Sequence, residues 1–426
     1  MKYNFNHRMN PLNAKANAFR PARNRAAVSA LLFAALAVSC SANGAEWTLA
    51  PDIQVGTESS DNNRLAENGG EIVVWGGFAD LAAIAQRRTE VSETQLRPRF
   101  VVSRYPGDED EDAESASLDF LTRTRGARHE WELKGNLAIA DVIRGEFIQL
   151  DFPDPDLDNP DEVGTGRVNV RRTRTLWRLG PRFSYDFSER MGGGIGVDYT
   201  DVSYDKEQVG EALDYNNARA EAFVLYRLSP IHRFKTSLFA SNFESDRINN
   251  DSTAYGFRGR YERDIGETIR VFIDAGGQRT TVEVGGAQGV ETSENGFLLD
   301  AGISRRWERT RLRASGGRSV LPDGSGFLRE IDRLRFNLIH DFTERWYLEA
   351  GAALLRARSL ENIVTSSDRD YYEIQVTMGY EFTRDWSLEA RAGRIMQDFL
   401  DTPGEAEANE FSLGVRYAPR GKVWSR

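Results

Sequence analysis

Arginine and acidic residues recur at alternate positions within apolar segments of this 426-residue chain. Arg258 and Arg260 form one such pair, and Arg333 and Arg335 form another. Residues two positions apart on a β-strand share one face. A guanidinium presents a planar set of donors that matches a carboxylate. The pattern therefore suits either guidance of an anionic solute or ion pairing with acids on neighbouring strands, and the sequence leaves both interpretations open.

Catalytic chemistry has little support in the sequence. The chain has four histidines, and His129, His232 and His340 each stand alone. No Gly-x-Ser-x-Gly motif and no His or Cys pair at metal-binding spacing is present. We therefore predict no enzyme activity, no catalytic residue, no cofactor and no metal site. Alternation places His340 on a lipid-facing surface near a turn, where we interpret it as an interfacial histidine.

Two acidic stretches, 108–112 and 151–162, are candidate binding sites. Asp154, Asp156 and Asp158 supply the hard oxygen ligands that calcium prefers. The stretch lacks the glycine and the terminal glutamate of an EF-hand loop, so a solvated loop is the favoured interpretation.

The elements that must position the charged residues are long β-strands. In the segment 367–382 one face collects Tyr372, Ile374 and Val376, whereas the other collects Glu373 and Gln375. Such alternation continues over more residues than the five or six of an average globular strand, and it reaches the 9–11 residues of a transmembrane β-strand. The predicted fold class is all-β, a transmembrane antiparallel up-and-down β-barrel.

A repeated turn supports the barrel. "YDFSERM", "HDFTERWYL" and "YEFTRDWSL" each place a short polar turn between aromatic residues. Longer acidic connections alternate with these turns. Short turns at one end and long loops at the other are typical of outer-membrane barrels, so we assign the short turns to the periplasmic side. The predicted periplasmic aromatic girdle comprises Phe187, Trp307, Phe342, Trp346, Phe382 and Trp386.

The alternation predicts 18 strands, an even number. The segment 75–88 is the least regular and has an alternative as a helix or plug, in which case the count is 16. The predicted strands are 47–57, 71–87, 93–105, 114–125, 127–149, 166–187, 190–205, 214–228, 231–245, 252–264, 267–284, 291–307, 310–321, 326–342, 345–358, 367–382, 385–400 and 408–418.

The same alternation predicts which charged side chains line the lumen. Barrels of 16 to 18 strands have a water-filled interior, so these charges need not be desolvated. The candidate lumen-lining residues for transport are Arg178, Arg182, Arg258, Arg260, Arg270, Arg313, Arg333, Arg335, Arg391, Glu373 and Glu389.

The first 45 residues have the features of a signal peptide. Six basic residues and no acid accompany the apolar run "AAVSALLFAALAVSC", and small residues follow. Removal of this leader takes 6 of 55 basic residues, leaving 49 against 65 acids and a formal charge of −16. Such a charge argues against a nucleic-acid partner. Residues 46–426 are expected to form a single barrel domain, and Cys40, a candidate lipidation site, is expected to leave with the leader.

The chain resembles the β-barrel porin 2 family of outer-membrane proteins from exopolysaccharide loci. The resemblance rests on "WTLAPDIQVGTESSDNN", on "ETQLRPRFVVSRY" and on the "DFTERW" and "EFTRDW" turns. The chain differs from many outer-membrane barrels at the C-terminus, where "RGKVWSR" follows "FSLGVRYAP". Either Tyr417 or Trp424 replaces the usual terminal aromatic residue, or the tail is a local extension.

The resemblance implies a conduit that exports exopolysaccharide across the outer membrane of a Gram-negative cell. Its implied partners are outer-membrane lipid and lipopolysaccharide, the barrel assembly machinery, exopolysaccharide and a polysaccharide co-polymerase. Two alternatives stay open: a general diffusion porin for small solutes, and a surface-binding barrel that anchors capsule or lipopolysaccharide.

Overall fold

The computed structural model describes residues 45–67, 69–142, 172–205, 213–245, 250–284, 290–322, 327–360, 368–400, 404–419 and 421–425. The chain divides into two units, Met1–Ala45 with Arg426, and Glu46–Ser425. The second unit is described below. The predicted leader, apart from Ala45, and the acidic stretch 151–162 lie outside the described residues.

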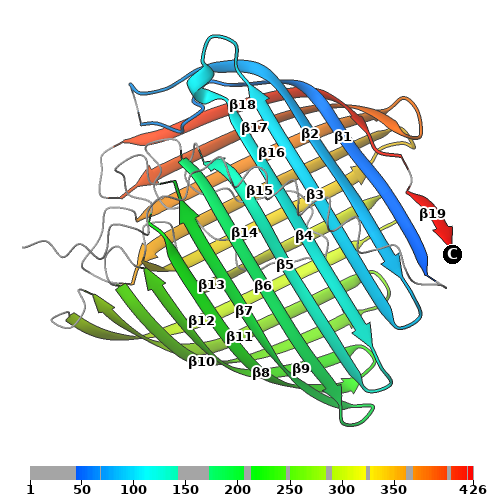
Figure 1. The fold of residues 1–426 in the computed structure, drawn as a ribbon, viewed down its shortest axis with the longest axis vertical. Helices are drawn as coiled ribbons and strands as arrows, with labels where there is room; N and C mark the ends of the chain where they lie inside the picture. The colour runs from blue at the N-terminus through cyan, green and yellow to red at the C-terminus, as the bar shows by residue number, and fades with distance from the viewer. Residues whose placement is uncertain are drawn as a thin grey trace, which may run out of the picture. The chain divides into compact units, whose positions relative to one another are not determined.

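The barrel unit consists of antiparallel strands (Figure 1). One short 3-10 helix, η2 (Glu109–Glu111), lies just before the strand that begins at Ala113. No helix among the described residues has the length and apolarity needed to cross a bilayer. The strands are β1 (Glu46–Ser60), β2 (Val74–Arg88), β3 (Ser92–Arg104), β4 (Ala113–Arg125), β5 (His129–Val142), β6 (Arg172–Asp186), β7 (Met191–Tyr204), β8 (Tyr215–Ser229), β9 (His232–Ser245), β10 (Asn250–Ile265), β11 (Ile269–Val284), β12 (Val290–Arg306), β13 (Thr310–Pro322), β14 (Leu328–Asp341), β15 (Trp346–Ser359), β16 (Arg369–Glu381), β17 (Trp386–Phe399), β18 (Glu405–Tyr417) and β19 (Lys422–Ser425).

Each of the strands β1 to β18 pairs with its neighbours in the chain, and β1 also pairs with β18. This pairing closes an up-and-down barrel of 18 strands, which confirms the predicted fold class. The segment interpreted as a strand or a plug is strand β2, which pairs with β1 along its whole length. The 16-stranded alternative is therefore wrong. The predicted strands 127–149 and 166–187 are described only as β5 and β6, because residues 143–171 are not described.

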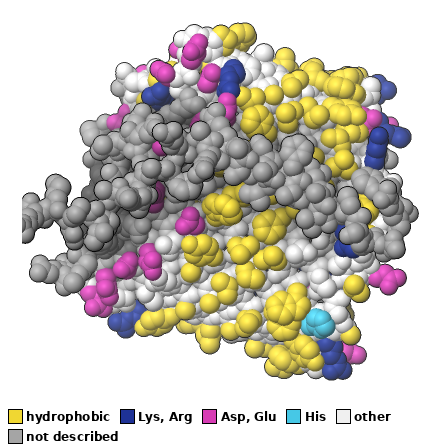
Figure 2. Space-filling model, viewed as in Figure 1, with side chains coloured by type: hydrophobic (Ala, Val, Ile, Leu, Met, Phe, Trp, Pro, Cys, Tyr) yellow, Lys and Arg dark blue, Asp and Glu magenta, His cyan; other side chains and the backbone are white. Residues whose placement is uncertain are grey.

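The two faces of the wall carry different side chains. On β16, Ile374 is 60% exposed and Val376 is 40% exposed, whereas Thr377 is 3% exposed. The apolar side chains on alternate positions therefore point outward, and Figure 2 shows hydrophobic residues gathered over the strands. The polar residues between them point inward. The inner face is not uniformly wet, because Thr377 is buried there although its position predicts contact with lumen water.

The repeated turn has a common hydrogen-bonding pattern. Thr343 Oγ1 accepts hydrogen bonds from the backbone N–H of Arg345 (3.2 Å) and Trp346 (3.1 Å). Thr383 Oγ1 accepts the matching bonds from Asp385 (3.3 Å) and Trp386 (3.2 Å). A Thr hydroxyl that satisfies turn N–H groups explains why the polar motif recurs between strands.

The opposite, long-loop end has apolar contacts inside the barrel. Leu328 and Val320, where β14 begins and β13 ends, pack in one cluster with Val202, Tyr215 and Phe243 from β7 to β9. A second cluster places Leu65 of the β1–β2 connection against inward residues of β15 to β18, including Tyr371 and Ile395. The first cluster joins walls that are far apart in strand order, and in the second a connecting loop folds onto the inner wall, so both narrow the interior at this end.

The C-terminal tail is a local extension of the barrel wall. Strand β18 ends at Tyr417 opposite Ile53, which leaves the start of β1 unpaired with β18. After a break, β19 pairs with Glu46–Leu49 of β1 and places Trp424 opposite Trp47 (Figure 1). The tail therefore covers a backbone edge that would otherwise have unpaired N–H and C=O groups.

Candidate functional site: a cationic strip on the inner wall

Three phenylalanine rings lie flat against the inner wall of β7 to β12. Phe239 stands directly opposite Gly256 in the β9–β10 ladder, and a Cβ at that glycine would come 2.6 Å from Phe239 Cζ. Only glycine leaves the ring room to lie on the backbone there. Phe223 opposite Gly194 and Phe272 opposite Gly302 repeat the arrangement.

Five cationic side chains lie over these rings. The guanidinium of Arg219 is 4.0 Å from the centroid of Phe239, and that of Arg260 is 4.4 Å from Phe272. Such cation–π contacts orient a cation without neutralising it. We call the set the cationic strip; it comprises Arg182 and Lys235 over Phe223 (5.7 and 4.6 Å), Arg219 and Arg258 over Phe239 (4.0 and 6.0 Å), and Arg260 over Phe272 (4.4 Å).

Acidic side chains compensate part of this charge. Glu221 forms an ion pair with Lys235, with its carboxylate 2.7 Å from Nζ, and a longer one with Arg182 at 3.5 Å. Glu262 pairs with Arg260 at 2.7 Å. Asp274 and Asp300, inward on β11 and β12, lie within electrostatic range of Arg258 and Arg260, and Asp300 also interacts with Arg333. The strip is therefore a row of alternating charges, not a purely basic surface.

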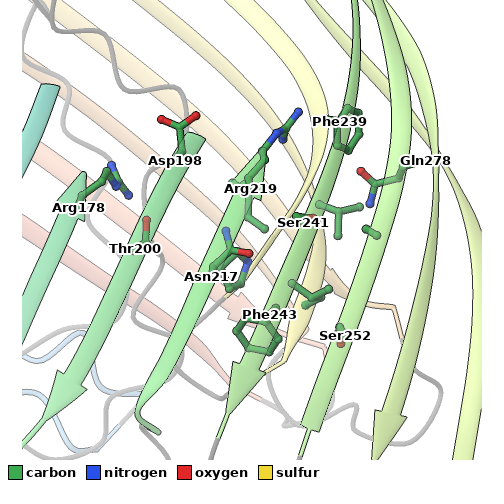
Figure 3. Close-up of a pocket in the computed structure, with 15 residues that line it drawn as sticks. Arg178, Asp198, Thr200, Asn217, Arg219, Phe239, Ser241, Phe243, Ser252 and Gln278 are labelled. Atoms are coloured by element: carbon green, nitrogen blue, oxygen red, sulfur yellow. The ribbon is translucent and has the colours of Figure 1, made fainter. Parts of the chain in front are cut away.

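A cavity of about 50 Å³ lies beside the strip (Figure 3). One side is the inner wall of β6 to β11, where Arg178, Asp198 and Arg219 contribute charged groups. The other side is apolar and comes from the β13–β14 end, through Val320 and Leu321. Because about 10–15 Å³ of such volume accommodates one water, the cavity is large enough for several waters or for the polar head of a small solute.

A second polar cluster, which we call the seam network, joins the first and last strands. Arg416 of β18 donates two hydrogen bonds to Asp52 of β1, at 2.8 and 2.7 Å. Glu389 of β17 accepts hydrogen bonds from the hydroxyl of Tyr347 at 2.5 Å and from Gln54 Nε2 at 3.1 Å. Arg416 and Ser387 also donate to Glu389, each at 3.3 Å.

The predicted lumen residues all lie at inward positions, but their surroundings differ. The structure brings Arg178, Arg182, Arg258 and Arg260 to one part of the wall. Asp300 interacts electrostatically with Arg258 and Arg260 and also with Arg333. The other predicted residues lie elsewhere on the wall. Arg270 forms an ion pair with Asp264 at the short-turn end, Glu373 accepts a hydrogen bond from the Tyr371 hydroxyl, and Glu389 belongs to the seam network. In the strand ladders, Arg313 is paired with Asn337, Arg335 with Ser315, and Arg391 with Thr377. Their role in transport stays a prediction.

The predicted girdle residues are exposed near the short turns. Trp346 packs on Tyr380 and Trp386 on Tyr417, each with ring centroids 4.7 Å apart. All six predicted girdle residues are between 40% and 56% exposed; they are Phe187, Trp307, Phe342, Trp346, Phe382 and Trp386. His340 lies in the same zone, where its Nδ1 is 2.8 Å from Thr310 Oγ1.

Sequence reasoning missed Arg219, Lys235 and the three phenylalanine rings. Alternation in the segment "YNNARAEAFVLY" already places Arg219, Glu221 and Phe223 on one face. What the sequence does not give is the register that sets Phe239 opposite Gly256. No group of three or more His, Cys, Asp or Glu arranged to hold a metal occurs among the described residues, and Asp154, Asp156 and Asp158 lie outside them.

No protein-family model matches the chain, and no curated protein matches it. Among solved structures, the chain is similar to the copper transporter OprC, with a TM-score of 0.46 and 11% identity over 89% of this chain and 66% of that protein. It therefore spans just under two thirds of the length of OprC. The chain is also similar to OccK2 (OpdF) of Pseudomonas aeruginosa in a complex with glucuronate, with a TM-score of 0.44 and 11% identity. The match covers 88% of this chain and 98% of OccK2.

OccAB4 of Acinetobacter baumannii gives a TM-score of 0.43 and 10% identity over 90% of this chain and 99% of its own. Similarity at this level transfers neither solutes nor residue roles to this chain.

Proposed function

We propose that this chain is an outer-membrane channel through which small hydrophilic solutes diffuse, with no chemistry of its own. The observation that carries the proposal is the contrast between the two faces of the closed 18-stranded wall. Large apolar side chains such as Leu238 (65% exposed) and Ile374 (60%) point outward around the barrel, whereas charged side chains point inward. A protein surrounded by water rarely exposes so much contiguous apolar surface.

The aromatic pairs near the short turns support the same environment. Tyr and Trp concentrate where a bilayer meets water, because their rings have an apolar body and a polar edge. In this proposal the short-turn end faces the periplasm, the leader directs export and the barrel assembly machinery inserts the chain. Outer-membrane lipid and lipopolysaccharide then contact the apolar band.

Export of exopolysaccharide, implied by the resemblance to the β-barrel porin 2 family, is the finer alternative. A polymer needs a continuous passage wide enough for a sugar chain along the whole barrel. The apolar cluster that joins the β13–β14 end to β7, β8 and β9 reduces the space at one end. This contact favours small solutes over a polymer. No described feature favours a surface-binding barrel in particular.

The proposal is tested by fractionation and by conductance. We expect the protein in the outer-membrane fraction, with faster gel migration when unheated than when boiled. Purified protein in planar bilayers should give stable ion conductance, and vesicles that contain it should admit sugars and amino acids but retain a polysaccharide. A soluble periplasmic protein would refute the membrane location. A membrane protein without conductance would instead favour the surface-binding alternative.

A further inference from the structure

Arg178, Asp198 and Arg219 are the charged side chains that line the cavity beside the cationic strip, and the opposite charges of Asp198 and Arg219 do not neutralise each other. Asp198 of β7 and Arg219 of β8 are direct partners in the antiparallel ladder, and both line the cavity. Side chains in such positions are usually close enough to interact. Yet neither residue forms an ion pair or a side-chain hydrogen bond within the part of the chain that the structure describes. Something must hold the two groups apart.

The two groups turn to opposite sides: Asp198 Oδ1 lies toward β6, where a Cβ on Gly180 would come 2.8 Å from it, and the guanidinium of Arg219 is held on the other side by Phe239. The Phe239 ring lies on Gly256 and is only 5% exposed, so its position is fixed by the wall. The guanidinium of Arg219 stacks on this ring at 4.0 Å, and Figure 3 shows it reaching toward Phe239 and away from Asp198. Stacking occupies the face of a guanidinium and leaves the N–H donors at its edge available for a carboxylate.

We propose that this cavity is a binding subsite for small zwitterions that carry a carboxylate and an ammonium on the same carbon, such as α-amino acids. The inference deepens the proposed diffusion channel and rests on it. Arg219 binds the carboxylate through its N–H edge, and Asp198 binds the ammonium. Asn217 and Thr200, which also line the cavity, supply further hydrogen-bonding groups.

A zwitterion fits this pair of charges better than a singly charged solute. A simple carboxylate gains the contact with Arg219 but is repelled by Asp198. A simple amine gains the contact with Asp198 but is repelled by Arg219 and by Arg178, which also lines the cavity. A molecule with both charges is attracted by both residues and leaves neither uncompensated in a confined space. The volume of about 50 Å³ suits the head group of a small amino acid, with any larger side chain toward the open lumen.

The test compares three solutes of matched size: alanine, propanoate and alaninamide. Uptake into vesicles that contain the parent channel is measured at low solute concentration, where uptake follows occupancy of the subsite. We expect alanine to enter about tenfold or more faster than either singly charged solute, the scale of one hydrogen bond to a charged group.

Two variants give effects of opposite sign. Arg219→Gln should slow alanine and propanoate and speed alaninamide, because the remaining Asp198 attracts cations. Asp198→Asn should slow alanine and alaninamide and speed propanoate. Arg97→Gln, which removes a cation from an inward position on β3, is the matched control and should leave the three relative rates unchanged.

The outcomes separate this inference from the proposed function. Conductance with equal entry of the three solutes, or rates that neither variant changes, would overturn the zwitterion subsite and leave the diffusion channel intact. A parent channel that neither conducts nor admits any of the three solutes would overturn the proposed function, and the subsite with it.

Discussion

The cationic strip and the seam network are both charged clusters on the inner wall, but they treat their charges differently. In the seam network, Glu389 is 5% exposed and accepts four hydrogen bonds, and Arg416 binds Asp52 through two nitrogens. In the strip, Glu221 and Glu262 pair with other cations, but Arg219 stacks on an aromatic ring and forms no ion pair among the described residues. A charge that is buried and fully bonded holds strands together, whereas a charge that is only oriented can still act on a passing solute. Inward charge alone therefore does not identify a transport residue.

The largest expected effect is on the stability of the seam. Glu389→Ala removes the acceptor shared by Tyr347, Gln54, Ser387 and Arg416. Breaking a buried charged network by removing one partner costs about 3–5 kcal/mol. We expect a loss of stability at the lower end of that range, because Arg416 keeps its hydrogen bonds to Asp52. The measurement is the urea midpoint of unfolding in detergent or vesicles. The reversal potential in a salt gradient should not move. A loss of stability no larger than that of Arg219→Gln would remove the distinction between the two regions.

A second prediction sharpens the contrast between the inner and outer faces on which the comparison depends. Val376→Arg places a charge on the outward face of β16 and should destabilise the barrel by about 2–4 kcal/mol if that position lies near the middle of a bilayer. Gln375→Arg, one residue away and inward, is the matched control and should cost much less. The measurement is the free energy of folding into vesicles. Equal costs at the two positions would contradict the assignment of the faces. Thr377 is unsuitable as a control, because it is 3% exposed and an Arg would not fit there.

A third prediction concerns the rings that orient the strip. Phe239→Leu keeps every charge but removes the platform under Arg219 and Arg258. Loss of the cation–π contacts should cost about 1 kcal/mol of stability. With the ring gone, Arg219 can turn toward Asp198, its partner in the ladder, and the local positive field should weaken. We expect the anion preference of the proposed channel to fall although its net charge is unchanged. An unaltered reversal potential would show that the ring has no positioning role.

The sequence predicted the barrel well because its strongest signal is local. Alternation of apolar and polar residues gave all 18 strands and the inward positions of the charges, and the Thr-containing turns gave the hairpins. The weakest segment, 75–88, is a strand whose outward face has small residues such as Gly77, Ala79 and Ala83 beside Leu81, so its periodicity is faint. The tail "KVWS" is too short to show any periodicity, yet it pairs as β19.

The candidate site was harder to predict because it depends on contacts between distant parts of the chain. The bond between Gln54 and Glu389 joins residues 335 positions apart, and no local pattern indicates it. The position of Phe239 over Gly256 follows from strand register, and one sequence does not fix register across each long connection. Glu389 looks like any other inward acid in the sequence, and only its partners show that it serves the seam.

The reversal potential in a potassium chloride gradient tests most directly whether the cationic strip sets the ion preference of the proposed channel. Three proteins are compared: the parent, the strip variant Arg219→Gln with Lys235→Gln, and the seam variant Glu389→Gln. We predict that the parent prefers chloride although the chain without its leader has a formal charge of −16, with 49 basic and 65 acidic residues. The reversal potential of the strip variant should shift toward a preference for potassium, and that of the seam variant should equal that of the parent. A parent that prefers potassium, with a reversal potential that the strip variant leaves unchanged, would contradict the account.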